Sequence, residues 1–169
     1  MVLEKESKIT LILGPSCSGK STYINDKYKN HKVLMGYDLV HNPVPKGRVI
    51  IHYNSFRPYG KSFKNLDFIS DVALRKIITS NRDIEAIFLC CSEQTLIERA
   101  QIRKFVEPNL RQSSSSYPTR MTLHFLKHID LDKHYEAWQD FLNKQNILTT
   151  YIDSNNSFKE VPEKYTSKI

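Results

Sequence analysis

The sequence of 169 residues lacks a long apolar run and contains only three cysteines. No apolar stretch approaches the roughly 18 residues that a membrane-spanning helix needs. The first residues, MVLEKESK, have no apolar core of the kind found in a secretory leader. Cys90 and Cys91 are adjacent and Cys17 lies among glycine and serine, so we expect buried or loop cysteines and no disulfide framework. These absences predict a cytoplasmic protein.

Acidic residues are scarce relative to basic ones, with 18 Asp and Glu against 25 Lys and Arg, and the formal net charge is +7. This balance favours anionic partners such as nucleotides, phosphorylated metabolites or nucleic acid, without choosing among them. Hydrophobic residues make up 40% and charged residues 25%, which excludes a disordered chain. We expect one domain over 1–169, because the chain is too short for two ordinary domains.

Short apolar runs alternate with stretches of helical periodicity. The runs cover 8–13, 32–37, 48–53, 85–91 and 147–152. Continuous apolar runs are typical of strands that are buried on both faces of a parallel sheet. The predicted helices cover 19–30, 65–81, 93–106, 118–128 and 130–146, with one helical turn at 157–161. The alternation predicts a three-layer α/β/α domain with about five parallel strands.

The most specific motif is GPSCSGKS at 14–21, which matches G-x-x-x-x-G-K-[ST] at every fixed position. We call residues 14–21 the glycine loop. It lies between a predicted strand and a predicted helix, where successive N–H groups can surround a phosphate. Lys20 is expected to reach the terminal phosphates, and the Ser21 hydroxyl to bind Mg²⁺. The predicted nucleotide contacts are Gly14, Pro15, Ser16, Cys17, Ser18, Gly19, Lys20, Ser21 and Thr22.

With this loop, and with FLCCSEQTLIERAQIRK at 88–104, the chain resembles the P-loop small-molecule kinases, a group that contains nucleotide, shikimate, gluconate and adenylylsulfate kinases. The resemblance implies a sheet of order 2-3-1-4-5, ATP and Mg²⁺, an acceptor pocket beside the loop and an arginine-bearing lid around 99–120. It also implies that Asp38 accepts the proton of the acceptor hydroxyl or holds Mg²⁺ through water. The expected catalytic residues are Lys20, Asp38, Arg99 and Arg103.

Arginines suit such a lid, because the planar guanidinium binds phosphate oxygens and neutralises charge during transfer. Ser92 is the predicted N-cap of the helix at 93–106, and Arg99 and Arg103 are four residues apart on one face of it. Arg111 and Arg120 are further candidates.

The stretch RVIIHYNSFRP at 48–58 ends an apolar strand with polar groups. In P-loop proteins the neighbouring strand often ends in an Asp that helps to hold Mg²⁺. Here His52 occupies that place, and a neutral imidazole is a poor partner for Mg²⁺, so the metal role is assigned to Ser21 and Asp38. The expected acceptor-binding residues are Asp38, His52, Asn54, Arg57 and Arg120.

Two of these roles have alternatives. Arg57 could pair with an acid such as Asp67 instead of binding an anionic acceptor. Asn155, in DSNNSFKEV at 153–161, resembles a residue of the adenine loop of these kinases, although Asn-rich turns also form for conformational reasons.

Together these patterns predict an ATP-dependent phosphotransferase that moves the terminal phosphoryl group of Mg·ATP to a hydroxyl or phosphate of a small metabolite. A polynucleotide 5′-hydroxyl kinase is one alternative, which the lack of a basic stripe interleaved with aromatics disfavours. A nucleotide-regulated ATPase or binding module is a second, and a sulfotransferase a third. The sequence predicts neither the acceptor nor the oligomeric state.

Overall fold

The structure is a computed structural model that describes residues 7–60, 64–106 and 116–161, without the side chains of 104–106 and 116–121. Its strands are β1 (Lys8–Gly14), β2 (Val33–Met35), β3 (Val49–Asn54), β4 (Asp83–Cys90), β5 (Leu148–Asp153) and β6 (Lys159–Val161). They form one sheet of order β2-β3-β1-β4-β5-β6. Strands β1 to β5 are parallel, and β6 runs antiparallel to β5. The predicted order 2-3-1-4-5 is therefore confirmed.

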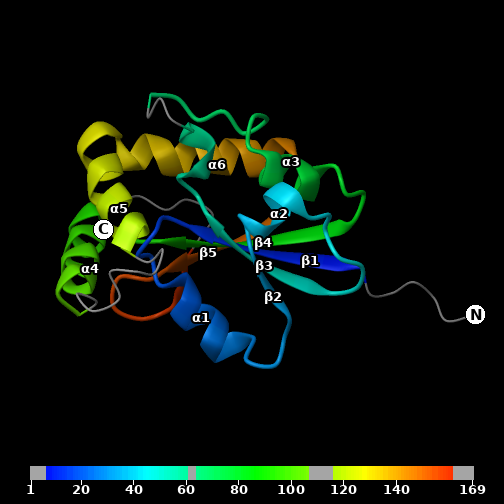
Figure 1. Ribbon diagram of the computed structural model, residues 1–169, viewed down its shortest axis with the longest axis horizontal. Helices are drawn as coiled ribbons and strands as arrows, with labels where there is room; N and C mark the ends of the chain where they lie inside the picture. Colours follow the sequence, from blue (N-terminus) through cyan, green and yellow to red (C-terminus); the bar gives the residue numbers. More distant parts are fainter. Residues whose placement is uncertain (1–6, 61–63, 107–115, 162–169) are drawn as a thin grey trace, which may run out of the picture.

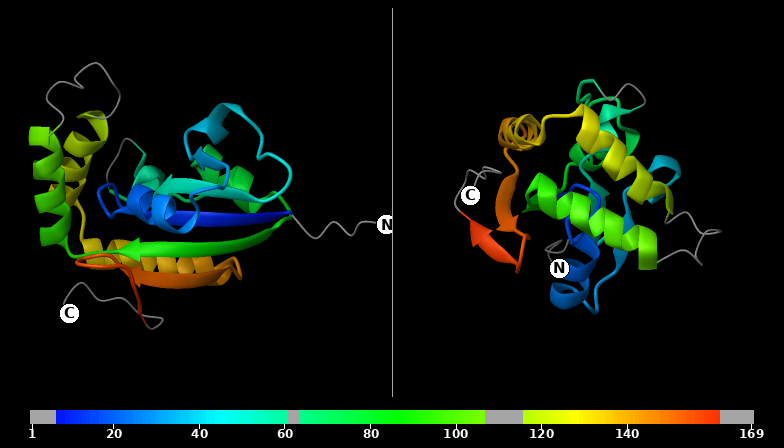
Figure 2. Two further views of the ribbon diagram at one scale, coloured as in Figure 1. Left: turned by 90° about the horizontal axis from the view of Figure 1, so that it is seen from below. Right: turned by 90° about the vertical axis from the view of Figure 1, so that its left-hand side faces the viewer.

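Helices cover both faces of this sheet. They are α1 (Lys20–Lys27), α2 (Asp38–His41), α3 (Val72–Ile78), α4 (Glu93–Val106), α5 (Ser116–His128), α6 (Leu131–Lys144) and the 3-10 helix η1 (Arg57–Tyr59). Figure 1 shows α1 on one face and α3 and α6 on the other, so the layers are those of an α/β/α arrangement. Figure 2 shows α4 and α5 standing at the end of the sheet to which the parallel strands point. Ligands of open α/β sheets bind at this end.

The core has two parts because successive residues of a strand face opposite sides of the sheet. Leu11 and Leu13 of β1 belong to the larger apolar cluster, with residues of α3 and α6. Ile12 belongs to the smaller one, with Tyr23 and Ile24 of α1. The predicted apolar face of the last helix is confirmed, since its side chains are buried or half-buried: Leu131, Tyr135, Trp138, Phe141 and Leu142.

Two predicted helical segments differ from the structure. The helix expected at 65–81 covers only Val72–Ile78, because Asp67 bonds to Ser70 in a preceding turn and Asp71 caps the helix, accepting from Leu74 N at 2.8 Å. The helical turn expected at 157–161 is replaced by β6, which pairs with the outer side of β5.

The position of Asp38 also differs from the expectation that it ends the second strand. β2 stops at Met35, and Asp38 is the first residue of α2. Its carboxylate accepts a hydrogen bond from the Met35 amide at 3.0 Å, which closes the turn between the two elements.

The structure also bears on the expectations about the cysteines and about membrane-spanning helices. The cysteines Cys17, Cys90 and Cys91 are free and buried, as predicted. Within the described ranges, none of the helices has the length and hydropathy that crossing a membrane requires.

Candidate functional site

The glycine loop joins β1 to α1 at the carboxyl end of the sheet, and its two glycines are required by geometry. A Cβ on Gly14 would lie 2.5 Å from the Leu89 carbonyl oxygen and 2.7 Å from Ser18 Oγ, closer than real side chains approach. Gly19, just before α1, has φ of 92°, in the left-handed region that glycine adopts without strain. The loop can therefore lie tightly against β4 and turn directly into the helix.

Lys20 lies folded over this loop. Its side chain is 4% exposed, and Nζ donates hydrogen bonds to the carbonyl oxygens of Gly14 at 2.9 Å and Pro15 at 2.6 Å. No carboxylate of the described residues pairs with it. Burial lowers the pKa of Lys20 from 10.5 to about 7. An anion placed here would stabilise the ammonium that burial disfavours.

Several donors of the loop have no partner among the described residues. Ser18 Oγ is buried without a hydrogen bond to any of them. Among the described residues, no backbone carbonyl accepts from the amides of Cys17, Gly19 and Lys20. Unpaired N–H groups at a helix N-terminus form an anion site. The loop therefore fits a phosphate group, with Lys20 as the neighbouring cation.

The two arginines of α4 reach the same loop. Ser92 caps α4 as predicted, since its Oγ accepts from Thr95 N at 3.2 Å. Arg99 Nη1 donates to the Cys17 carbonyl oxygen at 3.3 Å, and Arg103 Nη1 lies 3.9 Å from Cys17 Sγ. The predicted common face of α4 is thus directed at the glycine loop.

Arg99 and Arg103 differ in the hydrogen bonds that they make. The Arg99 guanidinium also donates to the carbonyl oxygens of Ser154 and Asn155, the latter at 3.0 Å, so it ties α4 and the loop to the β5–β6 connection. Arg103 is exposed, and no carboxylate of the described residues pairs with it. Arg103 is therefore the arginine that is available to an anion.

A cavity of about 430 Å³ opens between the glycine loop, α4 and the β5–β6 connection. Its lining residues are Cys17, Gly19, Thr22, Arg99, Ile102, Arg103, Ser154, Asn156, Ser157 and Phe158. Phe158 packs edge-on against Tyr23 of α1, with ring centroids 5.2 Å apart. The volume is in the range of about 300 to 1,000 Å³ that small-molecule sites occupy.

Asn155 is not among the residues that line this cavity. Its Oδ1 accepts from the Ser92 amide and from Thr95 Oγ1, both at 2.8 Å, and its Nδ2 donates to Asp153. The side chain therefore holds the β5–β6 connection against α4, while its neighbour Asn156 faces the cavity.

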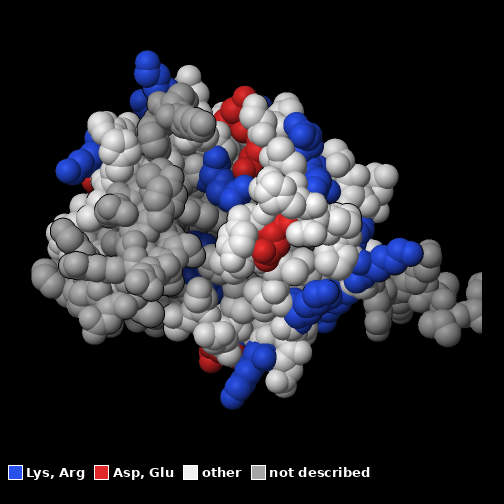
Figure 3. Space-filling model, in the orientation of Figure 1, with Lys and Arg blue, Asp and Glu red and all other residues white. Residues whose placement is uncertain are grey.

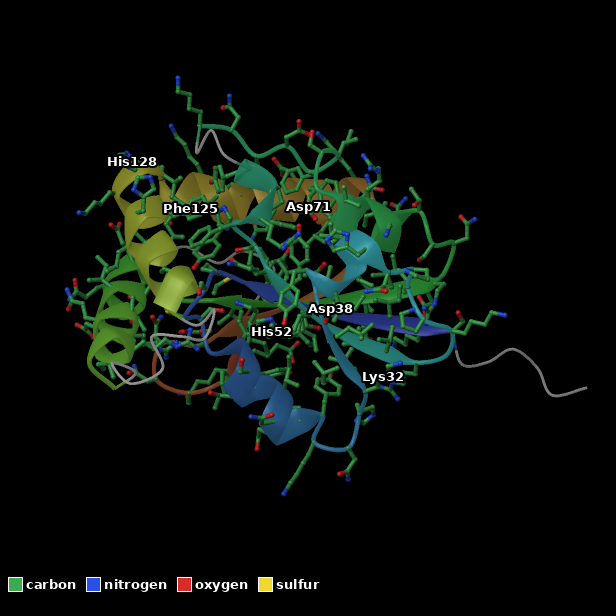
Figure 4. All side chains as sticks on the ribbon, viewed as in Figure 1. Lys32, Asp38, His52, Asp71, Phe125 and His128 are labelled. Atoms are coloured by element: carbon green, nitrogen blue, oxygen red, sulfur yellow. The ribbon has the colours of Figure 1, made fainter. Side chains whose placement is uncertain are left out.

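Ser21 is in contact with His52, and Asp38 lies just beyond the end of the neighbouring strand β2. Ser21 Oγ lies 3.4 Å from His52 Nε2. His52 is opposite Met35 in the β2–β3 register, and the Met35 amide bonds to Asp38 Oδ2. Figure 4 shows Asp38 and His52 near the carboxyl ends of these neighbouring strands. Of the predicted metal and acceptor residues, Ser21 and His52 are therefore in contact, and Asp38 lies at the adjacent strand end.

The protonation of His52 is set mainly by burial. Desolvation, followed by the charge of Lys20, lowers the pKa of His52 to about 3, so the imidazole is neutral at physiological pH. Asp38 is half-buried, and its Oδ1 has no hydrogen-bond partner among the described residues. That oxygen can accept a proton or a hydrogen bond from a ligand hydroxyl.

Asn54 and Arg57 follow on β3 and η1. Asn54 is opposite Gly14 in the sheet, and its Oδ1 accepts from the Phe56 amide at 3.1 Å. Arg57 Nε lies 3.2 Å from Asp71 Oδ2, so Arg57 does pair with an acid, although the acid is not Asp67.

Two predicted arginines cannot be placed. Arg111 and the side chain of Arg120 are outside the described part of the structure.

A buried network of hydrogen bonds between the end of β3, η1 and α6 could not be predicted from the sequence. His134 of α6 lies with Nε2 2.8 Å from Ser55 Oγ and Nδ1 3.1 Å from the Tyr59 hydroxyl. Burial lowers the pKa of His134 to about 3. The Trp138 indole donates to the Ser55 carbonyl oxygen at 2.9 Å. These bonds hold the end of β3 against α6, and no local spacing links residues so distant in the chain.

No protein-family model matches this chain, and no curated protein shows a significant sequence match to it.

Proposed function

We propose that the protein is an ATP-dependent phosphotransferase, which moves the terminal phosphoryl group of Mg·ATP to an acceptor bound beside Asp38 and His52. The observation that carries the proposal is the buried Lys20 ammonium over a loop of unpaired donors, with Arg103 at its border. A phosphate chain is the ligand that satisfies all of these groups at once.

Each residue has a role that follows from its position. The loop amides and Lys20 bind the terminal phosphates, and Ser21 Oγ is the ligand for Mg²⁺. The cavity between α4 and the β5–β6 connection holds the base and sugar. Arg103 neutralises the charge that develops during transfer. Bound Mg·ATP supplies the phosphoryl group and the positive charge of the metal.

Asp38 acts on the acceptor side. Its unpaired Oδ1 accepts the proton of the acceptor hydroxyl or orients a water of the metal. His52 is neutral and donates or accepts one hydrogen bond there, depending on its tautomer. Catalysis is then mainly positioning and charge stabilisation, as in other phosphoryl transfers.

The test is transfer from ATP labelled at its terminal phosphate to a panel of metabolites, with products identified by mass. Lys20→Met is expected to abolish transfer, because it removes the cation of the loop. Lys27→Met is the matched control, since Lys27 is an exposed residue of the same helix whose only ion pair with a described residue is with its neighbour Asp26. Wild-type activity in Lys20→Met would refute the proposal. Release of inorganic phosphate with no phosphorylated acceptor would favour the ATPase alternative.

The polynucleotide alternative is tested in the same panel by an oligonucleotide with a 5′-hydroxyl. On the described part of the face in Figure 3, Lys and Arg lie in several separate groups, with neutral surface and a few acids between them. A nucleic-acid channel would present a continuous basic groove. Steeply salt-dependent binding and phosphorylation of the oligonucleotide would favour that alternative over a small acceptor.

A further inference from the structure

Arg57 is the cation at the end of β3, where the acceptor of the proposed transfer would bind. In the structure it is paired with Asp71 at the start of α3, with 26% of the Arg57 side chain and 8% of the Asp71 side chain exposed. The other carboxylate oxygen of Asp71 caps α3 through the Leu74 amide. The guanidinium carbon lies 5.9 Å from the centre of the Tyr53 ring. Arg57 therefore joins β3 to α3, and its charge is already compensated.

A second cation near this end of the sheet, Lys76, is also engaged in hydrogen bonds within the fold. Lys76 of α3 reaches the last turn of α2 and donates to the carbonyl oxygens of Leu39, Val40 and Asn42 at 2.8, 3.2 and 3.1 Å. This is how a lysine satisfies the carbonyls that a helix end leaves unpaired. Among the described residues at this end of the sheet, the polar atoms left for a ligand include Asp38 Oδ1, the His52 ring and Asn54 Nδ2, which suit hydroxyl groups.

We infer that the acceptor is a neutral hydroxyl compound of the nucleoside, sugar or polyol class, and not a phosphate ester, because Arg57 is bound to the buried Asp71 carboxylate. The inference rests on the proposed function. A phosphate ester would bring its negative charge against Asp71, and separating the pair would leave a buried carboxylate unpaired. In the transfer, the hydroxyl oxygen bonds to the terminal phosphorus, the bond from that phosphorus to the ADP oxygen breaks, and the hydroxyl proton passes to Asp38.

The first experiment compares matched acceptors in the wild-type protein. Pairs that differ only by a phosphate ester, such as adenosine and AMP or ribose and ribose 5-phosphate, are supplied with labelled ATP and Mg²⁺. We expect a neutral member to be phosphorylated, and its phosphate ester to be used about tenfold less well or worse (about 1.4 kcal/mol).

The second experiment frees the arginine. Asp71→Asn keeps a side-chain oxygen for the α3 cap, because Asn caps helices as well as Asp, but it removes the charge that holds Arg57. Ribose 5-phosphate is titrated into the complex with a non-hydrolysable ATP analogue. We expect no Arg57-dependent binding in the wild type, about a tenfold gain in Asp71→Asn, and loss of that gain in Asp71→Asn/Arg57→Gln. Circular dichroism verifies that each variant is folded.

The outcomes separate the inference from the proposed function. Preferred phosphorylation of the ester, or wild-type binding of ribose 5-phosphate that Arg57→Gln removes, would overturn the inference and leave phosphoryl transfer standing. Transfer to no acceptor of either kind would refute the proposed function and the inference with it.

Discussion

Nucleotide binding is expected to take up a proton above neutral pH, because the pKa of Lys20 is lowered to about 7 by burial in the free protein. In the complex the phosphates replace the carbonyl oxygens of Gly14 and Pro15 as partners of Nζ, and their negative charge favours the ammonium. The free protein therefore binds fewer protons than the complex between about pH 7 and the ordinary lysine pKa of about 10.4.

The size of the effect follows from the two protonation states. At about pH 8, roughly one tenth of the free protein carries a charged Lys20, so binding takes up about 0.9 proton. The apparent affinity falls by up to about tenfold, or 1.4 kcal/mol, for each pH unit above 7. In the same range the unfolded chain binds more protons than the folded one, so the nucleotide-free protein gains stability from this group as pH rises.

The assay is isothermal titration calorimetry at about pH 8 in two buffers that differ in ionisation enthalpy, where a phosphate group with a pKa of about 6 is already ionised. The difference in heat gives the number of protons taken up. Lys20→Arg is the matched control, because arginine stays protonated and takes up none. If the wild-type protein gave equal observed heats in the two buffers and equal affinity at about pH 7 and 9, the reasoning would be refuted.

Four other predictions concern single residues. Asp38→Asn should lower the transfer rate by about 10² or more with little change in ATP affinity, and an equal loss of both in kinetics and calorimetry would contradict its role in proton transfer. Gly14→Ala should lower the free energy of unfolding by about 1–3 kcal/mol, because its Cβ would meet Leu89 O; denaturant titration measures this. Arg99→Ala should cost about 2–4 kcal/mol, since it removes three hydrogen bonds of a charged group, and an unchanged melting temperature would argue against the contact. Since burial lowers the pKa of His134 to about 3, stability should fall by about 1.4 kcal/mol per pH unit for this group as pH drops below about 6.5; His134→Asn should show a shallower dependence in urea melts.

The sequence predicted the parts of the fold that depend on local pattern. Apolar runs located β1 to β5, because strands in the interior of a parallel sheet are mostly apolar, and Ser92 located the start of α4 as its N-cap. The position of the glycine loop in the sequence followed from the fixed residues of its motif. The order of the strands came from the resemblance to a family and not from the residues alone.

The parts that the sequence did not predict depend on contacts between distant residues. Arg57 was expected to bind a ligand or to pair with Asp67, but the acid in reach is Asp71, because Asp67 is used in its own turn with Ser70. His134 carried no signal, since its partners, Ser55 just after β3 and Tyr59 of η1, lie far away in the sequence. Strand β6 is short and polar, so its composition resembles a turn.

The two outermost strands of the sheet, β2 and β6, are each three residues long. β6 covers Tyr151 to Asp153, so in the described part of the chain only the first half of β5 is left without a neighbour on its outer side. Unpaired backbone at a sheet edge is the usual template for joining two molecules into one continuous sheet, and short edge strands disfavour it. We therefore expect the folded protein to resist edge-to-edge aggregation.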